Sequence, residues 1–189
     1  MSTAKRLHYS YDEYRRSLEL SQIKLEYCDG VIYAMAGGTV AHGQLSAAAM
    51  AVLRAQLVGS CRVFSSDVLI RVESSDLSTY PDASVVCGEL ARSRIDPNAL
   101  TNPSILVEVT SKSTEDYDRG DKLSHYKQLP SLRAVLIISH RTRAITVIER
   151  SGAGWSERVA RSGEAVTLAE PRVTLSVDDV YFGVELEPD

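Results

Sequence analysis

Six short apolar segments, separated by polar connections, most strongly limit how this chain of 189 residues can fold. Each segment has the length and the β-branched residues typical of a buried strand. They are CRVFSS, VLIRV, ASVVC, ILVEVT, AVLIIS and AITVIER. The first two are also compatible with one bent strand. We predict polar connections at 73–81 and 88–103, and a smaller β extension after Gly152.

Helical and hairpin signals surround these segments. Ser10 and Glu13 form a capping-box pattern that predicts a helix ending near Leu20. An Asp-Gly pair at 29–30, between two β-like runs, predicts a hairpin. Helical spacing predicts further helices over 40–58 and 116–129. The order of elements indicates an α/β fold with a central mixed sheet flanked by helices, preceded by an N-terminal helix and hairpin.

Composition is that of one soluble globular domain, which we expect to span 1–189. No apolar run is long enough to cross a membrane, and the first residues lack the apolar region of a secretory signal. Cys28, Cys61 and Cys87 are odd in number and lack CxxC spacing. This pattern favours reduced thiols in the cytoplasm over a disulfide framework or a zinc site.

The net charge of -4 argues against tight, non-specific coating of DNA, for which a basic surface supplies the affinity. It does not exclude a nuclease. A carboxylate-rich metal site is itself acidic, and the bound ion adds positive charge that the sequence does not contain.

Two carboxylates interrupt the apolar pattern. Asp82 opens the segment ASVVC, and Glu108 lies within ILVEVT. Because side chains alternate along a strand, Leu106, Glu108 and Thr110 share one face. A charge among such residues needs a cation, a metal or strong donors. Mg²⁺ is often held by one or two carboxylates together with water and phosphate oxygens. The alternative is that Glu108 pairs with a basic residue of the following helix.

That helix offers a lysine. Lys122 and Tyr126 are four residues apart and share a face, so Lys122 could lie near Glu108. A lysine beside metal-bound water can orient the water or offset charge on a phosphate. Position on the helix alone favours a solvated lysine.

Tyr80-Pro81-Asp82, followed by the strand with Glu108, resembles the PD-(D/E)xK motif of restriction-endonuclease-like nucleases. The wider pattern is more specific and is similar to the Uma-type family of restriction endonucleases from about Tyr9 to Val184. It comprises KLEYCDGVIYAMAG, His42, CRVFSSDVLIRV, YPDASVVC, ILVEVTSKSTEDYDRGDKLSHYKQLPSL and the closing GVELE region.

The resemblance implies a restriction-endonuclease fold in which acidic residues bind Mg²⁺ or Mn²⁺. Asp82 and Glu108 match the motif acids, and Lys122 matches a helical lysine of the family. The residue two after Glu108 is Thr110, where the simplest motif has lysine. Either the lysine has migrated to Lys122 or catalysis is impaired; Lys112 is a weaker substitute because the family usually has no lysine there.

Four further residues fall on family-pattern positions, each with an ordinary alternative. Glu26 is a further metal or water ligand, or an exposed strand residue. His42 is expected to make a polar contact at the start of its helix rather than to bind the metal, because Mg²⁺ prefers oxygen ligands; a contact to phosphate is the alternative. A turn hydrogen bond explains Asp67 as well as catalysis does, and Tyr126 is expected to pack and to support Lys122 or Glu108.

We therefore predict a metal-dependent endonuclease that acts on nucleic acid, and we expect this nucleic acid to be DNA. An inactive nucleic-acid-binding or assembly module on the same fold is the first alternative, motivated by Thr110 and the acidic net charge. A metal-dependent hydrolase of a smaller phosphorylated substrate is the second. A two-fold homodimer is a hypothesis, because double-strand cutting needs one active site for each strand.

Overall fold

The computed structural model describes residues 7–35, 37–112 and 114–186. Both ends of the predicted 1–189 domain, at 1–6 and 187–189, lie outside these residues. The predicted lack of a secretory signal therefore concerns residues that lie partly outside the described ranges, and the last residue of GVELE lies outside them too. The same holds for Ala36, near the end of the predicted hairpin.

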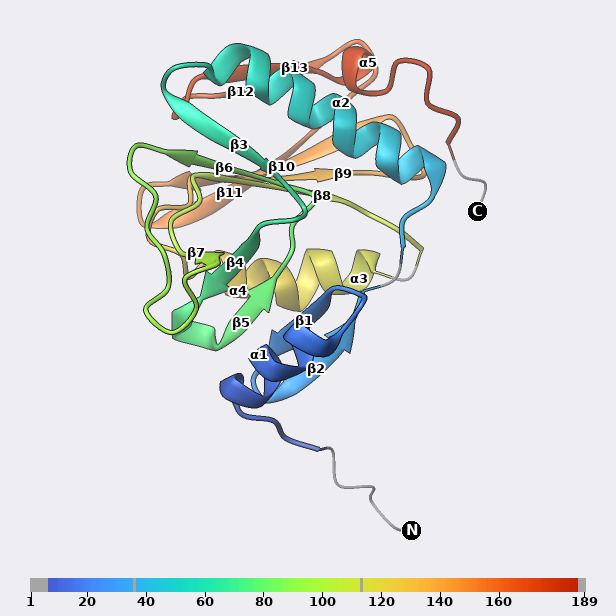
Figure 1. Cartoon of the computed structure of the whole chain (residues 1–189). Helices are drawn as coiled ribbons and strands as arrows, with labels where there is room; N and C mark the ends of the chain where they lie inside the picture. Colours follow the sequence, from blue (N-terminus) through green and yellow to red (C-terminus); the bar gives the residue numbers. More distant parts are fainter. Residues whose placement is uncertain (1–6, 36, 113, 187–189) are drawn as a thin grey trace.

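A six-stranded mixed sheet forms the centre of the molecule, in the order β11-β10-β9-β8-β6-β3 (Figure 1). Strands β8 and β9 run parallel, and the other neighbours run antiparallel. The bounds are β3 Cys61–Ser65, β6 Ala83–Cys87, β8 Ile105–Val109, β9 Ala134–Ile138, β10 Ala144–Ser151 and β11 Gly154–Arg161. The predicted central mixed sheet is therefore confirmed.

Helical segments cover both faces of this sheet. Helix α2 (Val40–Leu57) packs on one face, with β12 (Ala165–Leu168), β13 (Val173–Ser176) and α5 (Val177–Val180) in the same layer (Figure 1). On the other face lies a helical segment of α3 (Glu115–Tyr117), a π-helical stretch η2 (Asp118–Lys122) and α4 (Leu123–Tyr126).

Alternation along β8 divides its residues between the two layers. Val107 and Val109 pack in the core beneath α2, whereas Leu106 packs with Leu123 and Tyr126 of α4. The prediction that Leu106 shares its face with Glu108 fits this division, because the Glu108 side chain contacts Tyr126. One side of β8 is therefore apolar, and the other side directs the Glu108 carboxylate toward the helical segment.

The N-terminal part of the chain adds a smaller five-stranded sheet in the order β2-β1-β5-β4-β7. Helix α1 (Tyr11–Leu20) begins with the predicted capping box between Ser10 and Glu13. The predicted hairpin forms from β1 (Leu25–Cys28) and β2 (Val31–Ala34), with positive φ at Asp29 and Gly30. Strand β5 (Leu77–Thr79) pairs with both β1 and β4 (Leu69–Val72), and β7 is Ala99–Leu100.

Three predictions about elements were wrong in part. CRVFSS and VLIRV are not one bent strand, because a turn at 66–67 sends β3 and β4 into different sheets. The connection at 73–81 contains a 3₁₀ turn, η1 (Glu73–Ser75), and strand β5, and the connection at 88–103 contains β7. Segment 116–129 is helical only to Tyr126 and includes π-helical hydrogen bonding.

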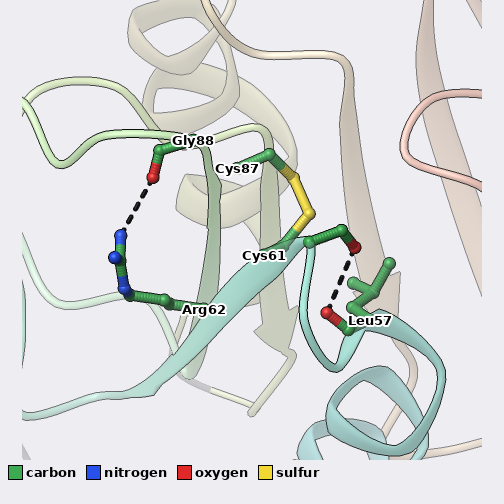
Figure 2. Close-up of a disulfide and its surroundings, with 6 residues drawn as sticks. Leu57, Cys61, Arg62, Cys87 and Gly88 are labelled. Carbon is green, nitrogen blue, oxygen red and sulfur yellow. Dashed lines mark hydrogen bonds between the residues drawn. A yellow bond between two sulfur atoms is a disulfide. The ribbon is translucent and has the colours of Figure 1, made fainter.

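The expectation of reduced thiols was wrong for two of the three cysteines. Cys61 and Cys87 are direct register partners of β3 and β6, and they form a disulfide (Figure 2). Sequence spacing could not reveal this pair, because only the antiparallel register brings the residues together. Cys28 is a free cysteine. The cytoplasmic location loses its support from thiol chemistry and stays a prediction.

Within the three described ranges, no helix has the length and apolar character needed to span a membrane.

We expect the Cys61–Cys87 disulfide to stabilise the fold by restricting the unfolded chain. Replacing both residues with alanine should lower the free energy of unfolding by roughly 2–4 kcal/mol. Urea denaturation with and without dithiothreitol measures this. The reductant should lower the midpoint of the wild type and leave the double variant unchanged; equal wild-type midpoints would contradict the disulfide's role.

Candidate metal centre

Asp82 directly precedes β6, and Glu108 lies in the neighbouring antiparallel strand β8. Strands β6 and β8 pair Ala83 with Val107, and continuing this register by one residue places Asp82 opposite Glu108. The Asp82 Oδ2 atom accepts a hydrogen bond from the Val109 N–H at 2.7 Å. It also lies 3.3 Å from His42 Nε2. The strand pairing therefore brings together the two carboxylates predicted as metal ligands, and the end of β8 orients one of them.

Glu108 is buried beneath the helical segment, with 4% of its surface exposed. The Lys122 Nζ atom lies 2.9 Å from Glu108 Oε1, and the Tyr126 hydroxyl donates to the same oxygen at 2.5 Å. Both contacts come from the helix face that the spacing of Lys122 and Tyr126 predicted. Lys122 is 4% exposed, so it is not the solvated lysine of the alternative interpretation.

Lys122 faces three buried carboxylates. Besides Glu108, its Nζ atom lies 3.5 Å from Asp118 Oδ1 and 3.8 Å from Glu26 Oε1. Glu26 is 8% exposed, which excludes the exposed strand residue considered from the sequence. Its Oε1 atom accepts hydrogen bonds from the Tyr80 N–H at 3.0 Å and from the Thr79 hydroxyl. Strand β1, strand β8 and the helical segment thus each contribute a carboxylate to one ammonium.

The cluster contains more carboxyl groups than cationic groups. Burial raises the pKa of Glu108 to about 8; Lys122 opposes this rise, and the nearby Asp118 and Asp82 carboxylates add to it. Burial also raises the pKa of Asp118, against the effect of Lys122. Burial disfavours the charged form of Lys122, but Glu108 and the other anionic neighbours raise its pKa above the usual range. The raised pKa of Lys122 therefore favours its cationic form, whereas the raised pKa of Glu108 favours its neutral form near pH 7.

The donor set suits a hard divalent cation. Carboxylate oxygens are the ligands that Mg²⁺ prefers, and the ion often keeps several waters. Within the described ranges, no three His, Cys, Asp or Glu side chains lie close enough together to hold a metal ion. A centre of two carboxylates, Asp82 and Glu108, completed by water and substrate oxygens needs no such group. The residues present therefore fit the predicted type of site.

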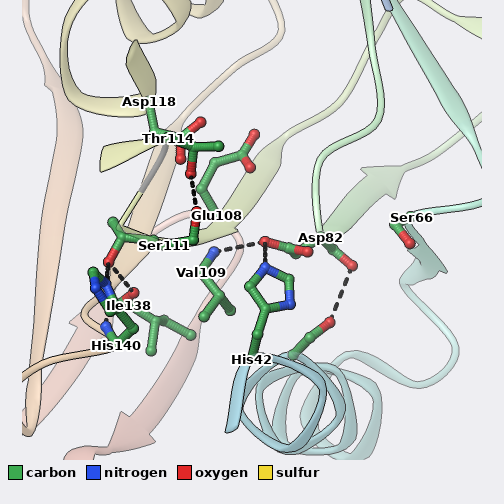
Figure 3. Close-up of polar contacts among 12 residues, drawn as sticks. His42, Ser66, Asp82, Glu108, Val109, Ser111, Thr114, Asp118, Ile138 and His140 are labelled. Carbon is green, nitrogen blue, oxygen red and sulfur yellow. Dashed lines mark hydrogen bonds and ion pairs between the residues drawn. The ribbon is translucent and has the colours of Figure 1, made fainter. Parts of the chain in front are cut away.

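His42 holds Asp82 rather than extending the carboxylate cluster. Its backbone N–H donates a hydrogen bond to the Thr39 hydroxyl at the start of α2, as expected for a helix-start contact. A hydrogen bond to Asp82 raises the pKa of His42, against the effect of burial. Figure 3 shows His42 and Val109 beside Asp82, and Glu108 directed toward Asp118.

Asp67 lies elsewhere. It is 79% exposed in the turn between β3 and β4, where it pairs with Lys24 at 2.7 Å and bonds to Ser65. The turn interpretation accounts for these contacts, and the structure does not bring Asp67 to Lys122.

The lysine position of the simplest motif is occupied by a buried threonine. Thr110 is fully buried, and its hydroxyl lies 2.7 Å from His140 Nδ1. Lys112 is exposed. Lys122 is the lysine that reaches Glu108, although its catalytic role stays a prediction.

Asp118 was missed in the sequence. It is four residues before Lys122, a spacing that favours an ion pair on a helix and could have identified it. The π-helical stretch that contains both residues gave no recognisable signal in the sequence.

Comparisons with known proteins agree with this architecture. A family model, Uma2, described as "Putative restriction endonuclease", matches residues 11–178. An uncharacterized protein of Synechocystis sp. is 33% identical over 93% of this chain and 92% of its own length. A second uncharacterized protein of that organism is 29% identical over 67% of this chain and 72% of its own length.

A crystal structure from Anabaena variabilis, described as "a putative nuclease belonging to DUF820", has a similar fold, with a TM-score of 0.70. It covers 85% of this chain and 91% of its own chain at 18% sequence identity. The predicted restriction-endonuclease-like fold class is confirmed.

We expect Lys122→Met to destabilise the metal-free protein by roughly 3–5 kcal/mol, because it leaves buried carboxylates without their cation. Adding Glu108→Gln should restore much of this loss. Chemical denaturation in the presence of a chelator gives the values, with the exposed Lys112→Met as matched control. Equal losses for Lys122→Met and Lys112→Met would refute the charge balance described here.

Proposed function

The chain belongs to the Uma2 family, and from that premise we propose that it is a metal-dependent endonuclease that hydrolyses phosphodiester bonds in DNA. The observation that carries the proposal is the buried excess of carboxylates around Lys122. A purely structural ion pair would need one carboxylate. A divalent cation, bound together with a phosphate substrate, would give the additional carboxylates a function.

Asp82 and Glu108 would hold the ion, and Glu26 would contact a water of the ion rather than the ion itself, because no three such side chains are grouped in the described residues. When bound, Mg²⁺ or Mn²⁺ polarises a phosphoryl oxygen and makes a bound water more acidic. The strand pairing and the Val109 N–H fix Asp82, and the Tyr126 hydroxyl fixes Glu108. Ligands held in this way reach the required geometry without reorganisation.

Lys122 would act on the reacting groups. Its ammonium already lies 2.9 Å from a proposed metal ligand, so a water or phosphate at the centre would lie close to it. Because its pKa is raised, Lys122 stays protonated and donates hydrogen bonds. It would therefore orient the attacking water and offset negative charge on the phosphate, rather than remove a proton.

A catalytically inactive binding module is the second candidate function. It is favoured by Thr110 at the motif lysine position and by the two contacts that Asp82 Oδ2 makes with His42 and Val109. Such a module would bind nucleic acid in a salt-dependent manner without cutting it.

Cleavage of supercoiled, linear, single-stranded and branched DNA tests the proposal, with Mg²⁺, Mn²⁺ or chelator. We expect metal-dependent cutting that falls at least about a hundredfold in Asp82→Ala and Lys122→Met. Asp116→Asn and Lys112→Met are matched controls, because both residues are exposed, and they should cut like the wild type.

Full metal-dependent activity in Asp82→Ala would exclude the assigned centre. Salt-dependent binding without cutting under any condition would instead support the inactive module.

Metal affinity should depend on pH, because a protonated carboxyl cannot serve as a ligand. Burial raises the pKa of Glu108 to about 8. The apparent affinity for Mn²⁺ should therefore increase by about tenfold for each pH unit from 6 to 8 and then level off. Calorimetry in buffers of different ionisation enthalpy should show one proton released near neutral pH. An affinity that is constant from pH 6 to 8 would argue against Glu108 as a ligand.

A further inference from the structure

A cavity of about 420 Å³ lies at the turn between α2 and β3. Its lining residues are Arg54, Gly59, Ser60, Cys61, Arg62 and Gly88. Among the residues that the structure describes, no Asp or Glu side chain lines it. The chain as a whole has a net charge of -4, so this cavity is a local exception with two cationic groups and no anionic one.

Arg54 and Arg62 have no carboxylate partner that offsets their charges. Four other arginines form ion pairs with Asp or Glu, namely Arg71, Arg119, Arg141 and Arg158. Within residues 7–35, 37–112 and 114–186, no ion pair includes Arg54 or Arg62. Two like charges beside one cavity repel each other, and an anion between them would replace this repulsion with attraction.

Arg62 is held in place by contacts within the protein. Its Nη1 atom donates a hydrogen bond to the Gly88 carbonyl oxygen at 2.9 Å (Figure 2). The disulfide joins Cys61 to Cys87, which immediately precede Arg62 and Gly88 in the chain. The contact with Gly88 uses one N–H of a guanidinium that has several. A cation fixed in this way loses less conformational entropy when it binds a ligand.

The two guanidinium groups favour phosphate over other anions. A guanidinium is a planar fork of N–H donors that matches a phosphate group in a bidentate manner. A phosphate monoester carries about -1.5 to -2 charges at pH 7, which matches two arginines. A carboxylate or an internal phosphodiester carries a single charge. The cavity is also large enough for a phosphate and a small organic group attached to it.

The cavity is separate from the proposed metal centre. Asp82 directly precedes β6 and Gly88 directly follows it, so the length of the strand separates them by about 20 Å. His42 contacts Asp82, and Arg54 lies about 18 Å further along α2. The strand and the helix thus give a similar separation. An anion in the cavity is too far away to reach the metal centre, and the inference does not rest on the proposed function.

We propose that this cavity binds a phosphate monoester, held between the guanidinium groups of Arg54 and Arg62. A nucleotide and the 5′-phosphorylated end of a DNA strand both carry this group. In either case the site recognises the terminal phosphate and not the base. No aromatic side chain among the described residues lines the cavity, so a base has nothing to stack on.

Inorganic phosphate is the first probe, added to the intact, metal-free protein and followed by ¹H–¹⁵N NMR. We expect shifts in the side-chain Nε–H signals of Arg54 and Arg62 and in the backbone amide signal of Gly88. Arg54→Gln and Arg62→Gln should each weaken binding by about tenfold or more, because each removes charge-assisted hydrogen bonds.

Both arginines are exposed, so the two variants should fold like the wild type. Arg94→Gln is the matched control, because Arg94 is exposed, lies outside the cavity and loses the same charge. It should bind phosphate like the wild type.

Further probes identify the source of the phosphate. We expect adenosine 5′-monophosphate to shift the same signals and adenosine to leave them unchanged. Tighter binding of adenosine 5′-monophosphate than of a short 5′-phosphorylated oligonucleotide would assign the site to nucleotides. The reverse order would assign it to the ends of DNA strands.

Three results would overturn the inference. They are unchanged Arg54 and Arg62 signals in phosphate, equal affinities of Arg54→Gln and Arg94→Gln, and equal shifts with oligonucleotides that carry or lack the 5′-phosphate. The proposed function fails or stands separately, because Asp82→Ala should abolish cutting and leave phosphate binding at Arg54 unchanged.

Discussion

The ammonium of Lys122 is the interaction on which the rest of the site depends. It lies within 4 Å of carboxylates from β1, β8 and the helical segment, and β1 lies far from the other two in the sequence. Burying Glu26, Glu108 and Asp118 around one cation costs free energy unless hydrogen bonds and further positive charge compensate. The Tyr126 hydroxyl supplies part of that compensation. Under the proposed function, a divalent ion would compensate the remaining carboxylates, and the metal-free site would be less stable than an evenly paired one.

Local rules predicted the parts of the site that depend on one element. Alternation along a strand placed Glu108 on the polar face of ILVEVT, and helical spacing placed Lys122 beside Tyr126. The capping box and the hairpin were equally legible. These signals depend only on residues that are close in sequence, so they can be recognised without knowing the tertiary structure.

Features that depend on pairing between residues far apart in the chain could not be predicted from the sequence. The apolar runs of β3 and β4 look alike, and only the turn at 66–67 sends them into different sheets. Cys61 and Cys87 are 26 residues apart, and register alone joins them. Glu26 required β1 to pair with β5 before Tyr80 could hold its carboxylate. Asp118 needed the π-helical stretch, for which the sequence has no pattern.

The proposed metal centre comprises the carboxylates around Lys122 together with Asp82. Paramagnetic broadening of backbone amide signals by Mn²⁺ tests it most directly, because broadening falls steeply with distance from the ion. We expect the amides of Tyr80 and Val109 to broaden first, at low Mn²⁺ concentration, and to stay sharp in Glu108→Gln. Broadening confined to exposed acidic residues such as Asp116, or unchanged in Glu108→Gln, would contradict the claim.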